Sequence, residues 1–121
     1  YPALATPGAI YALRRSEPVD VTVGDTTGTV QRPTLLGALV IKSAAYSITV
    51  DPHRERHLDD LALLASMLTA RDLRGAELSK GEVKYVREAV PVAQGHLATT
   101  IIEGAPDGLA RLARLLERSP A

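Results

Sequence analysis

Lys42 stands inside the otherwise apolar or small segment GALVIKSAAYS and is the residue whose position most suggests chemistry. The segment favours a helix, so the lysine needs a carboxylate partner or a path to water. Asp60 lies after one short connection, at the start of the next apolar stripe. Two antiparallel helices would bring Lys42 and Asp60 together, and the lysine would then neutralise phosphate oxygens as a compact point charge.

Both residues also have a purely structural interpretation. Lys42 would then form a structural ion pair, or lay its stem along apolar surface with its amine in water. Asp59 and Asp60 would complement the macrodipole in the first turn of a helix that begins near residue 58. The pattern leaves these alternatives open beside phosphate binding.

Basic residues gather in the segment HRERH, which follows Pro52 and is predicted to connect the two helices. His53 and His57 are four residues apart, a spacing at which a helix presents two imidazoles to zinc. The neighbouring proline and the missing H-E-x-x-H arrangement favour a solvated basic turn instead. Arg54, Arg56 and His57 are therefore predicted to contact phosphate, and no metal ligands are assigned.

The composition limits the classes of function. The chain has 121 residues, and 14 Lys and Arg balance 14 Asp and Glu, so no global field attracts it to nucleic acid or membranes. It has four Tyr but no Phe or Trp, which leaves an aliphatic core and little material for stacking on bases. The absence of Cys fits a cytoplasmic protein. No segment approaches the ~20 apolar residues that span a bilayer, so no membrane association is expected.

Hydrophobic periodicity predicts an α+β fold, in which a β-hairpin precedes a bundle of about four helices. The segment VDVTV alternates apolar and polar residues and predicts a half-buried strand. A turn with the sequence GDTTG and a second short strand follow, and Pro33 ends the hairpin, which covers about residues 19–32. Residues 1–33 thus hold an irregular start and the hairpin, and residues 34–121 hold the helices, within one domain.

The start signals of the helices are capping residues. Thr34 is predicted to cap the first helix, Ser79 and Glu82 form a capping box for the third, and Asp107 is predicted to cap the last. The third helix is expected to end near Pro91. The four helices are expected at residues 35–48, at 58–70, from 79 to about 91, and from about 107 onward.

Three short motifs occur in a fixed order along the chain: K-x-x-A, a basic stretch, and D-L-x-x-L. Their residues are Lys42 and Ala45, then Arg54 and Arg56, and then Asp60, Leu61 and Leu64. In this order they resemble the C-terminal part of nucleotidyltransferase-fold proteins of the AbiEii and MenT toxin-like type. The resemblance covers roughly residues 7–70, and the remainder of the chain is similar only as a helical tail.

The resemblance implies metal-dependent transfer of a nucleoside monophosphate from a nucleoside triphosphate to an acceptor. Lys42 would contact phosphate and Asp60 would support the site, so both would be catalytic residues. Mg²⁺ is the implied cofactor. The acceptor would be RNA, a protein or a small molecule, and some members suggest tRNA. Such chemistry depends on cations placed around the charge that develops during the reaction.

The chain departs from the family pattern in its metal-binding half. No Gly-Ser turn followed by D-x-[DE] occurs, because Thr22 stands where VDVTV would need a second acid. Arg56 and His57 also replace a Lys-Asp step. Two explanations fit: the chain is the C-terminal portion of a longer protein and is inactive alone, or the protein has lost catalysis. The alternative is a non-catalytic helical module that binds a partner chain or a second copy through its hairpin edge.

Overall fold

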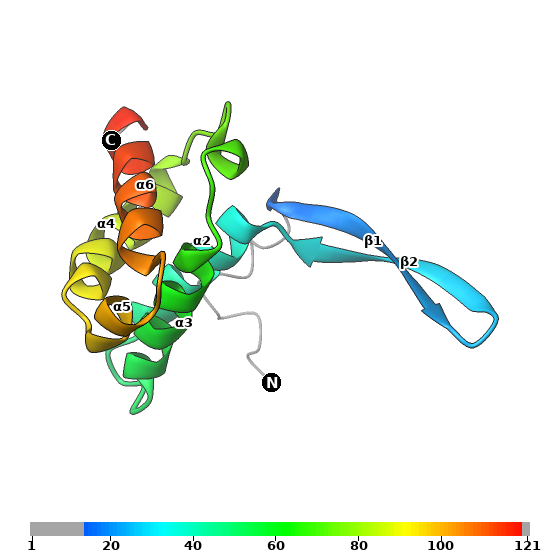
Figure 1. Cartoon of the computed structure of the whole chain (residues 1–121), viewed down its shortest axis with the longest axis horizontal. Coiled ribbons are helices and arrows are strands. Elements are labelled where there is room, and N and C mark those ends of the chain that lie inside the picture. Colours follow the sequence, from blue (N-terminus) through cyan, green and yellow to red (C-terminus); the bar gives the residue numbers. More distant parts are fainter. Residues whose placement is uncertain (1–13, 120–121) are drawn as a thin grey trace.

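The protein consists of a β-hairpin followed by a bundle of helices, which confirms the predicted α+β class (Figure 1). The computed structural model describes residues 14–119. In chain order the elements are β1 (Ser16–Val23), β2 (Thr26–Pro33), α2 (Leu35–Tyr46), α3 (Arg54–Ser66), the 3-10 helix η2 (Arg71–Leu73), α4 (Lys80–Gln94), α5 (Leu97–Ile101) and α6 (Ala105–Arg118).

The hairpin is longer than predicted, because β1 begins at Ser16 and β2 extends to Pro33; part of the expected turn also belongs to the second strand. The two strands pair antiparallel over Ser16–Pro33, and Val23 lies opposite Thr26. Only Gly24 and Asp25 form the loop. Gly24 has a φ of 60°, which suits the first central residue of a type II′ turn and explains the glycine. The GDTTG turn was therefore predicted too long, since Thr26 already begins β2.

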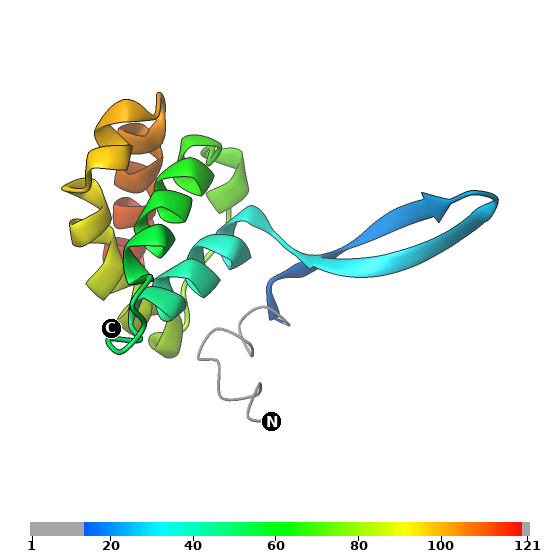
Figure 2. The same ribbon diagram turned by 90° about the horizontal axis from the view of Figure 1, so that it is seen from below.

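One face of the hairpin is apolar, yet the helices do not cover it. Val19 lies opposite Val30, and Val21 and Val23 follow on the same face. Val21 is 41% exposed, Val30 50% and Val23 75%. The prediction of a half-buried strand was wrong here, because alternation separates two faces without determining what covers either. Figures 1 and 2 show the hairpin extending away from the helices.

Helix α2 begins at Leu35, directly after its predicted cap, Thr34. The Thr34 hydroxyl accepts a hydrogen bond from the N–H of Gly37 at 3.1 Å, which confirms the cap. The helix ends at Tyr46, two residues before the predicted end. It buries a broad band of aliphatic and small side chains against α3 and α4, and Lys42 lies at the edge of this band.

Helix α3 begins four residues before its predicted start, so the segment HRERH is not a loop. The Asp51 carboxylate accepts a hydrogen bond from the His53 N–H at 2.8 Å. The Asp51 carbonyl accepts one from the Arg54 N–H at 3.4 Å. An acidic residue before Pro52 is a helix start signal, and it outweighed the loop character of the proline. The helix also ends earlier than predicted, at Ser66.

The capping box of α4 is confirmed, but its predicted end is not. The Ser79 hydroxyl accepts from the Glu82 N–H, and the Glu82 carboxylate accepts from the Ser79 N–H at 2.8 Å. The helix continues for three residues past Pro91. Pro91 is exposed and removes one N–H donor near the helix end, whereas Val90 and Ala93 remain buried on the core face. Burial therefore extends the helix beyond the proline.

Helix α6 begins after a glycine rather than at the predicted aspartate cap. Gly104 is the N-cap, and its φ of 85° lies in the left-handed region. Asp107 instead occupies the first turn, where it complements the macrodipole. One turn into the helix, a Cβ on Gly108 would overlap the carbonyl oxygen of Ala65. The backbones of α3 and α6 therefore touch at Gly108.

The core is aliphatic, as the composition predicted, and lies between α2, α3, α4 and α6. Its largest fully buried side chains include Leu39, Val40, Leu58, Leu61, Val83, Val86, Leu109, Leu112 and Leu115. Within residues 14–119, none of the helices combines the length and the apolar character needed to cross a bilayer.

Candidate functional site

Lys42 and Asp60 form an ion pair between α2 and α3. The Lys42 Nζ lies 2.8 Å from the Asp60 Oδ2, so the two residues meet as their spacing predicted. The Lys42 side chain is 34% exposed and the Asp60 side chain 45%. A pair this open to water contributes about 0–1 kcal/mol to stability, so it is not needed to hold the helices together. The ammonium can therefore exchange its carboxylate for another anion at little cost.

The surroundings of Lys42 leave its side chain partly exposed to water. One turn away on α2, Ala38 and Ala45 are small, whereas Leu39 and Tyr46 are large and buried. On α3, Arg56 precedes Asp60 by four residues and shares its face. Arg56 is exposed and forms no ion pair or side-chain hydrogen bond within the described part of the chain. Arg56 is thus a second cation one helical turn from Asp60, and it is not in contact with that carboxylate.

Arg54, another predicted phosphate contact, is engaged in the α2–α3 connection. Its guanidinium donates two hydrogen bonds to the Tyr46 carbonyl, at 3.0 Å and 2.7 Å, and lies 4.2 Å from the centre of the Tyr46 ring. These contacts satisfy a carbonyl at the end of α2. Arg54 therefore fixes how α3 follows α2, and only its remaining N–H groups can reach an anion.

His57 also contributes to the connection. Its Nε2 lies 3.2 Å from the Asp51 Oδ2, and its Nδ1 is buried without a hydrogen-bond partner. The hydrogen bond from the His53 N–H lowers the pKa of Asp51 below its ordinary value of 3.8; desolvation opposes this shift and His57 adds to it. His57 thus helps to hold the turn that starts α3, while His53 is exposed.

Asp59 and Asp60 do not stand in the first turn of α3, so their predicted role with the macrodipole was wrong. Because the helix begins at Arg54, the acid of that turn is Glu55. Each aspartate instead meets a basic group of another segment: Asp60 meets Lys42, and the Asp59 Oδ1 lies 2.7 Å from the His96 Nε2. The two adjacent acids therefore face different neighbours.

The described residues do not provide the ligands that the implied Mg²⁺ requires. Residues 14–119 contain no group of three His, Cys, Asp or Glu side chains that could hold a metal ion. Asp60, the nearest carboxylate to Lys42, is already paired with it. Mg²⁺ requires several oxygen ligands in octahedral geometry. Within the described residues, the α2–α3 site therefore lacks the set of ligands that a Mg²⁺ centre needs.

A second basic region, which was not predicted from the sequence, lines a cavity of about 620 Å³. Arg111, Arg114 and Arg118 border this cavity from α6, and Arg74 borders it from the facing segment. The spacing of the three α6 arginines at i, i+3 and i+7 could have indicated a basic helix face. The position of Arg74 depends on tertiary structure and had no such signal.

Comparison of the chain with models of protein families, with curated proteins and with solved structures finds no match. The resemblance to nucleotidyltransferase-fold proteins therefore stays a prediction that rests on its motif residues.

Proposed function

We propose that this chain is the C-terminal portion of a nucleotidyltransferase-like protein, and that α2 and α3 supply the phosphate contact for its nucleoside triphosphate. The observation that carries the proposal is the half-exposed ion pair of Lys42 and Asp60 at 2.8 Å. An exposed pair at the edge of an apolar helix adds little stability, so a role in binding accounts for it better than a role in folding.

Each residue of the site has a separate task in this proposal. Lys42 neutralises a phosphate oxygen, as a compact ammonium does well. Asp60 holds the lysine stem in place until the anion arrives, and Arg56 adds a second cation on the same side. Arg54 and His57 keep the α2–α3 connection in one geometry through Tyr46 and Asp51. Preorganised cations reduce the reorganisation needed when phosphate charge develops.

The hairpin is consistent with a protein that contributes only part of a site. β1 pairs with β2, and the described residues provide no third strand. Two strands alone are marginally stable in water, and their outer edges are ready to pair with further strands. Because the described residues do not fit Mg²⁺, we expect no turnover from the chain alone. A reaction that consumes nucleoside triphosphates would place the protein in the cytoplasm.

Calorimetric titration of the purified chain with nucleoside triphosphates and Mg²⁺ tests the proposal. Lys42→Met keeps the stem and removes the charge, so we expect it to weaken binding about tenfold or more, the range for a charge-assisted hydrogen bond. Lys80→Met is the matched control, because Lys80 is exposed at the start of α4 and outside the site.

Two results would contradict the proposal. Equal affinity in the original chain and in Lys42→Met would show that the lysine is structural. Robust nucleotide transfer by the chain alone, abolished by Lys42→Ala, would show that the site is complete without further sequence.

The second candidate function is a non-catalytic module that binds a partner chain or a second copy. It is favoured by apolar side chains that the described residues leave exposed. Val23 is 75% exposed on the hairpin, and Leu97 and Ile101 are each 70% exposed on α5. This candidate predicts that Lys42→Met retains all binding. Sedimentation of the chain over a range of concentrations, compared with Leu97→Ser, tests self-association directly.

A further inference from the structure

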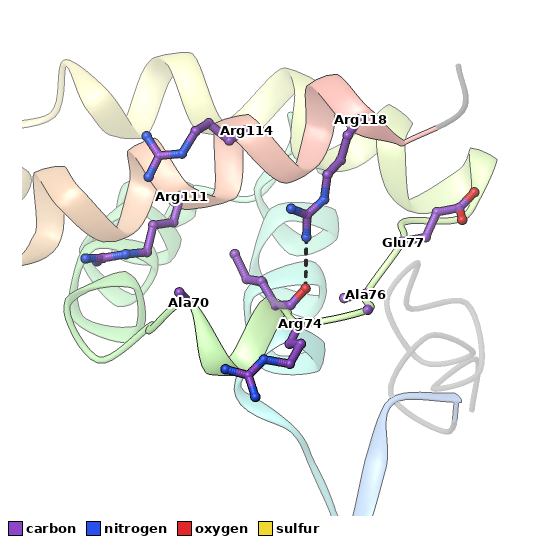
Figure 3. Close-up of a pocket in the computed structure, with 9 residues that line it drawn as sticks. Ala70, Arg74, Ala76, Glu77, Arg111, Arg114 and Arg118 are labelled. Atoms are coloured by element: carbon purple, nitrogen blue, oxygen red, sulfur yellow. Dashed lines mark hydrogen bonds between the residues drawn. The ribbon is translucent and has the colours of Figure 1, made fainter.

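The arginine-lined cavity carries several positive charges and is separate from the α2–α3 site. It is about 620 Å³ in volume and lies between α6 and the segment of residues 70–77. Figure 3 shows Arg111, Arg114 and Arg118 on α6 and Arg74 on the facing segment. A cavity of this size falls within the range of small-molecule sites, which is roughly 300–1,000 Å³.

Two of the arginines are fixed by backbone carbonyls. The Arg118 Nη2 donates to the Leu73 carbonyl at 2.9 Å, and the Arg111 Nη1 donates to the Leu68 carbonyl at 3.2 Å. A guanidinium has five N–H donors, so each of these residues retains most of its donors. The carbonyls therefore orient the two cations without neutralising them.

The other two arginines have no protein partner within residues 14–119. Arg74 and Arg114 are exposed, and neither takes part in an ion pair or a side-chain hydrogen bond there. Glu77 is the sole carboxylate in the lining, and it forms no ion pair in the described part of the chain. The lining thus carries four arginines and one carboxylate, and this excess of positive charge favours an anion.

The arrangement points to phosphate as the anion. Guanidinium groups bind phosphate oxygens through paired N–H donors, which a lysine cannot do. Arg111 and Arg118 are separated along α6 by about 10 Å, from the rise per residue of a helix. The backbone positions of the two arginines are thus farther apart than the size of one phosphate group, so a ligand with several phosphate groups can contact both side chains. The lining contains no aromatic residue, so it offers no aromatic ring on which a base could stack.

We propose that this cavity is an anion site for ligands with two or more linked phosphate groups. Recognition is through the phosphates alone, so the chain of phosphates in a nucleotide and the backbone of a nucleic acid are two sources of the same chemistry. The site is separate from Lys42 and Asp60, neither of which lines the cavity. It therefore stands whether or not the α2–α3 site binds nucleotide.

The test is a binding titration with two defined probes, inorganic tripolyphosphate and a short fluorescent oligouridine, at low salt. The variant is Arg74→Gln with Arg114→Gln, because neither side chain forms an ion pair or a hydrogen bond within residues 14–119. The control is Lys80→Gln with Arg87→Gln, which removes the same charge from exposed positions of α4. Circular dichroism checks that both variants keep their helices.

We expect the cavity variant to lose about tenfold or more of its affinity for a probe, and the control to change about twofold or less. A loss confined to oligouridine would assign the site to a nucleic-acid backbone, and a loss confined to tripolyphosphate would assign it to nucleotide-sized ligands. The proposal is overturned if neither probe binds, or if the cavity variant and the control lose affinity equally. Equal losses would mean that the affinity for the probes depends only on the net charge of the protein.

Discussion

Arg15 and Glu82 form a two-point ion pair across 67 residues of sequence. The Arg15 Nη2 donates to the Glu82 Oε1 at 2.8 Å, and its Nε donates to the Oε2 of the same carboxylate. Arg15 also donates to the Glu77 carbonyl, and its own carbonyl accepts a hydrogen bond from the Thr34 N–H. The residue just before β1 is thus tied to α4 and to the start of α2, which fixes the base of the hairpin on the helices.

This pair predicts that the protein loses stability in acid. Burial raises the pKa of Glu82, but the hydrogen bonds from Arg15 and Ser79 and the charge of Arg15 lower it more, so the pKa lies below its ordinary value of 4.5. A lowered folded-state pKa stabilises the protein above the unfolded-state value, and this contribution disappears as pH falls through the folded-state pKa. Urea unfolding across about pH 7 to 3 should show the decline.

The variant Glu82→Gln separates the contribution of Glu82 to the acid sensitivity from that of the other carboxylates. Glu82→Gln should reduce the free energy of unfolding near neutral pH by about 2 kcal/mol, because it leaves Arg15 without its charged partner. It should also flatten the acid side of the stability profile. An unchanged slope in Glu82→Gln would assign the acid sensitivity to other groups, such as Asp51, whose pKa is also lowered.

The helix contact at Gly108 predicts a strong effect of a single methyl group. Gly108→Ala would force the Cβ into the Ala65 carbonyl, so α3 and α6 would have to separate. We expect a loss of about 3 kcal/mol or more in urea unfolding, at the upper end for overpacking. Gly95→Ala is the control: Gly95 has a negative φ, and a Cβ there would lie at ordinary contact distance, 3.8 Å from the Val92 carbonyl oxygen. Its replacement should therefore change stability by about 0.5 kcal/mol or less. Similar losses for both variants would contradict the close helix contact.

Lys42→Met should leave the free energy of unfolding within about 1 kcal/mol of the original value. The ion pair with Asp60 is half-exposed, and the methionine retains the apolar stem. Thermal unfolding followed by circular dichroism measures this. A loss much larger than expected would show that the pair is structural, and any loss of nucleotide affinity in the variant would then need a second explanation.

The valines of the hairpin should tolerate polar replacement. Val21, Val23 and Val30 are largely exposed, so replacing all three by Thr keeps the β-branched shape and should change the stability of the helices by about 0.5 kcal/mol or less. Leu112→Ala, at a fully buried position of α6, should instead cost about 2–5 kcal/mol. A large loss from the valine replacements would mean that another surface covers this face in solution.

Local signals predicted the elements of this fold better than their ends. Thr34 and the Ser79–Glu82 box were read correctly because capping depends on a few neighbouring residues. The start of α3 was missed because Asp51 and Pro52 indicate a turn and a helix start equally well. The end of α4 was missed because burial of Ala93 outweighed the lost hydrogen bond at Pro91.

The candidate sites also differ in how far the sequence could predict them. Lys42 and Asp60 could be paired from the sequence, because they flank one short connection between consecutive helices. The cavity could not be predicted in full, since Arg74 and Arg114 lie forty residues apart and meet only through the packing of α6. Arg15 and Glu82 are still more distant in sequence, and no local pattern connects them.

The exposed hairpin gives the molecule two levels of local stability. Within residues 14–119, its strands meet the helices only at their base. The amide hydrogens of the hairpin should therefore exchange with solvent through local opening, whereas those of α3 and α6 should exchange only on global unfolding. The hairpin can therefore change its pairing without loosening the core. An incoming strand that adds to its edge would slow exchange in β1 and β2 alone, and this protection would identify the bound edge residue by residue.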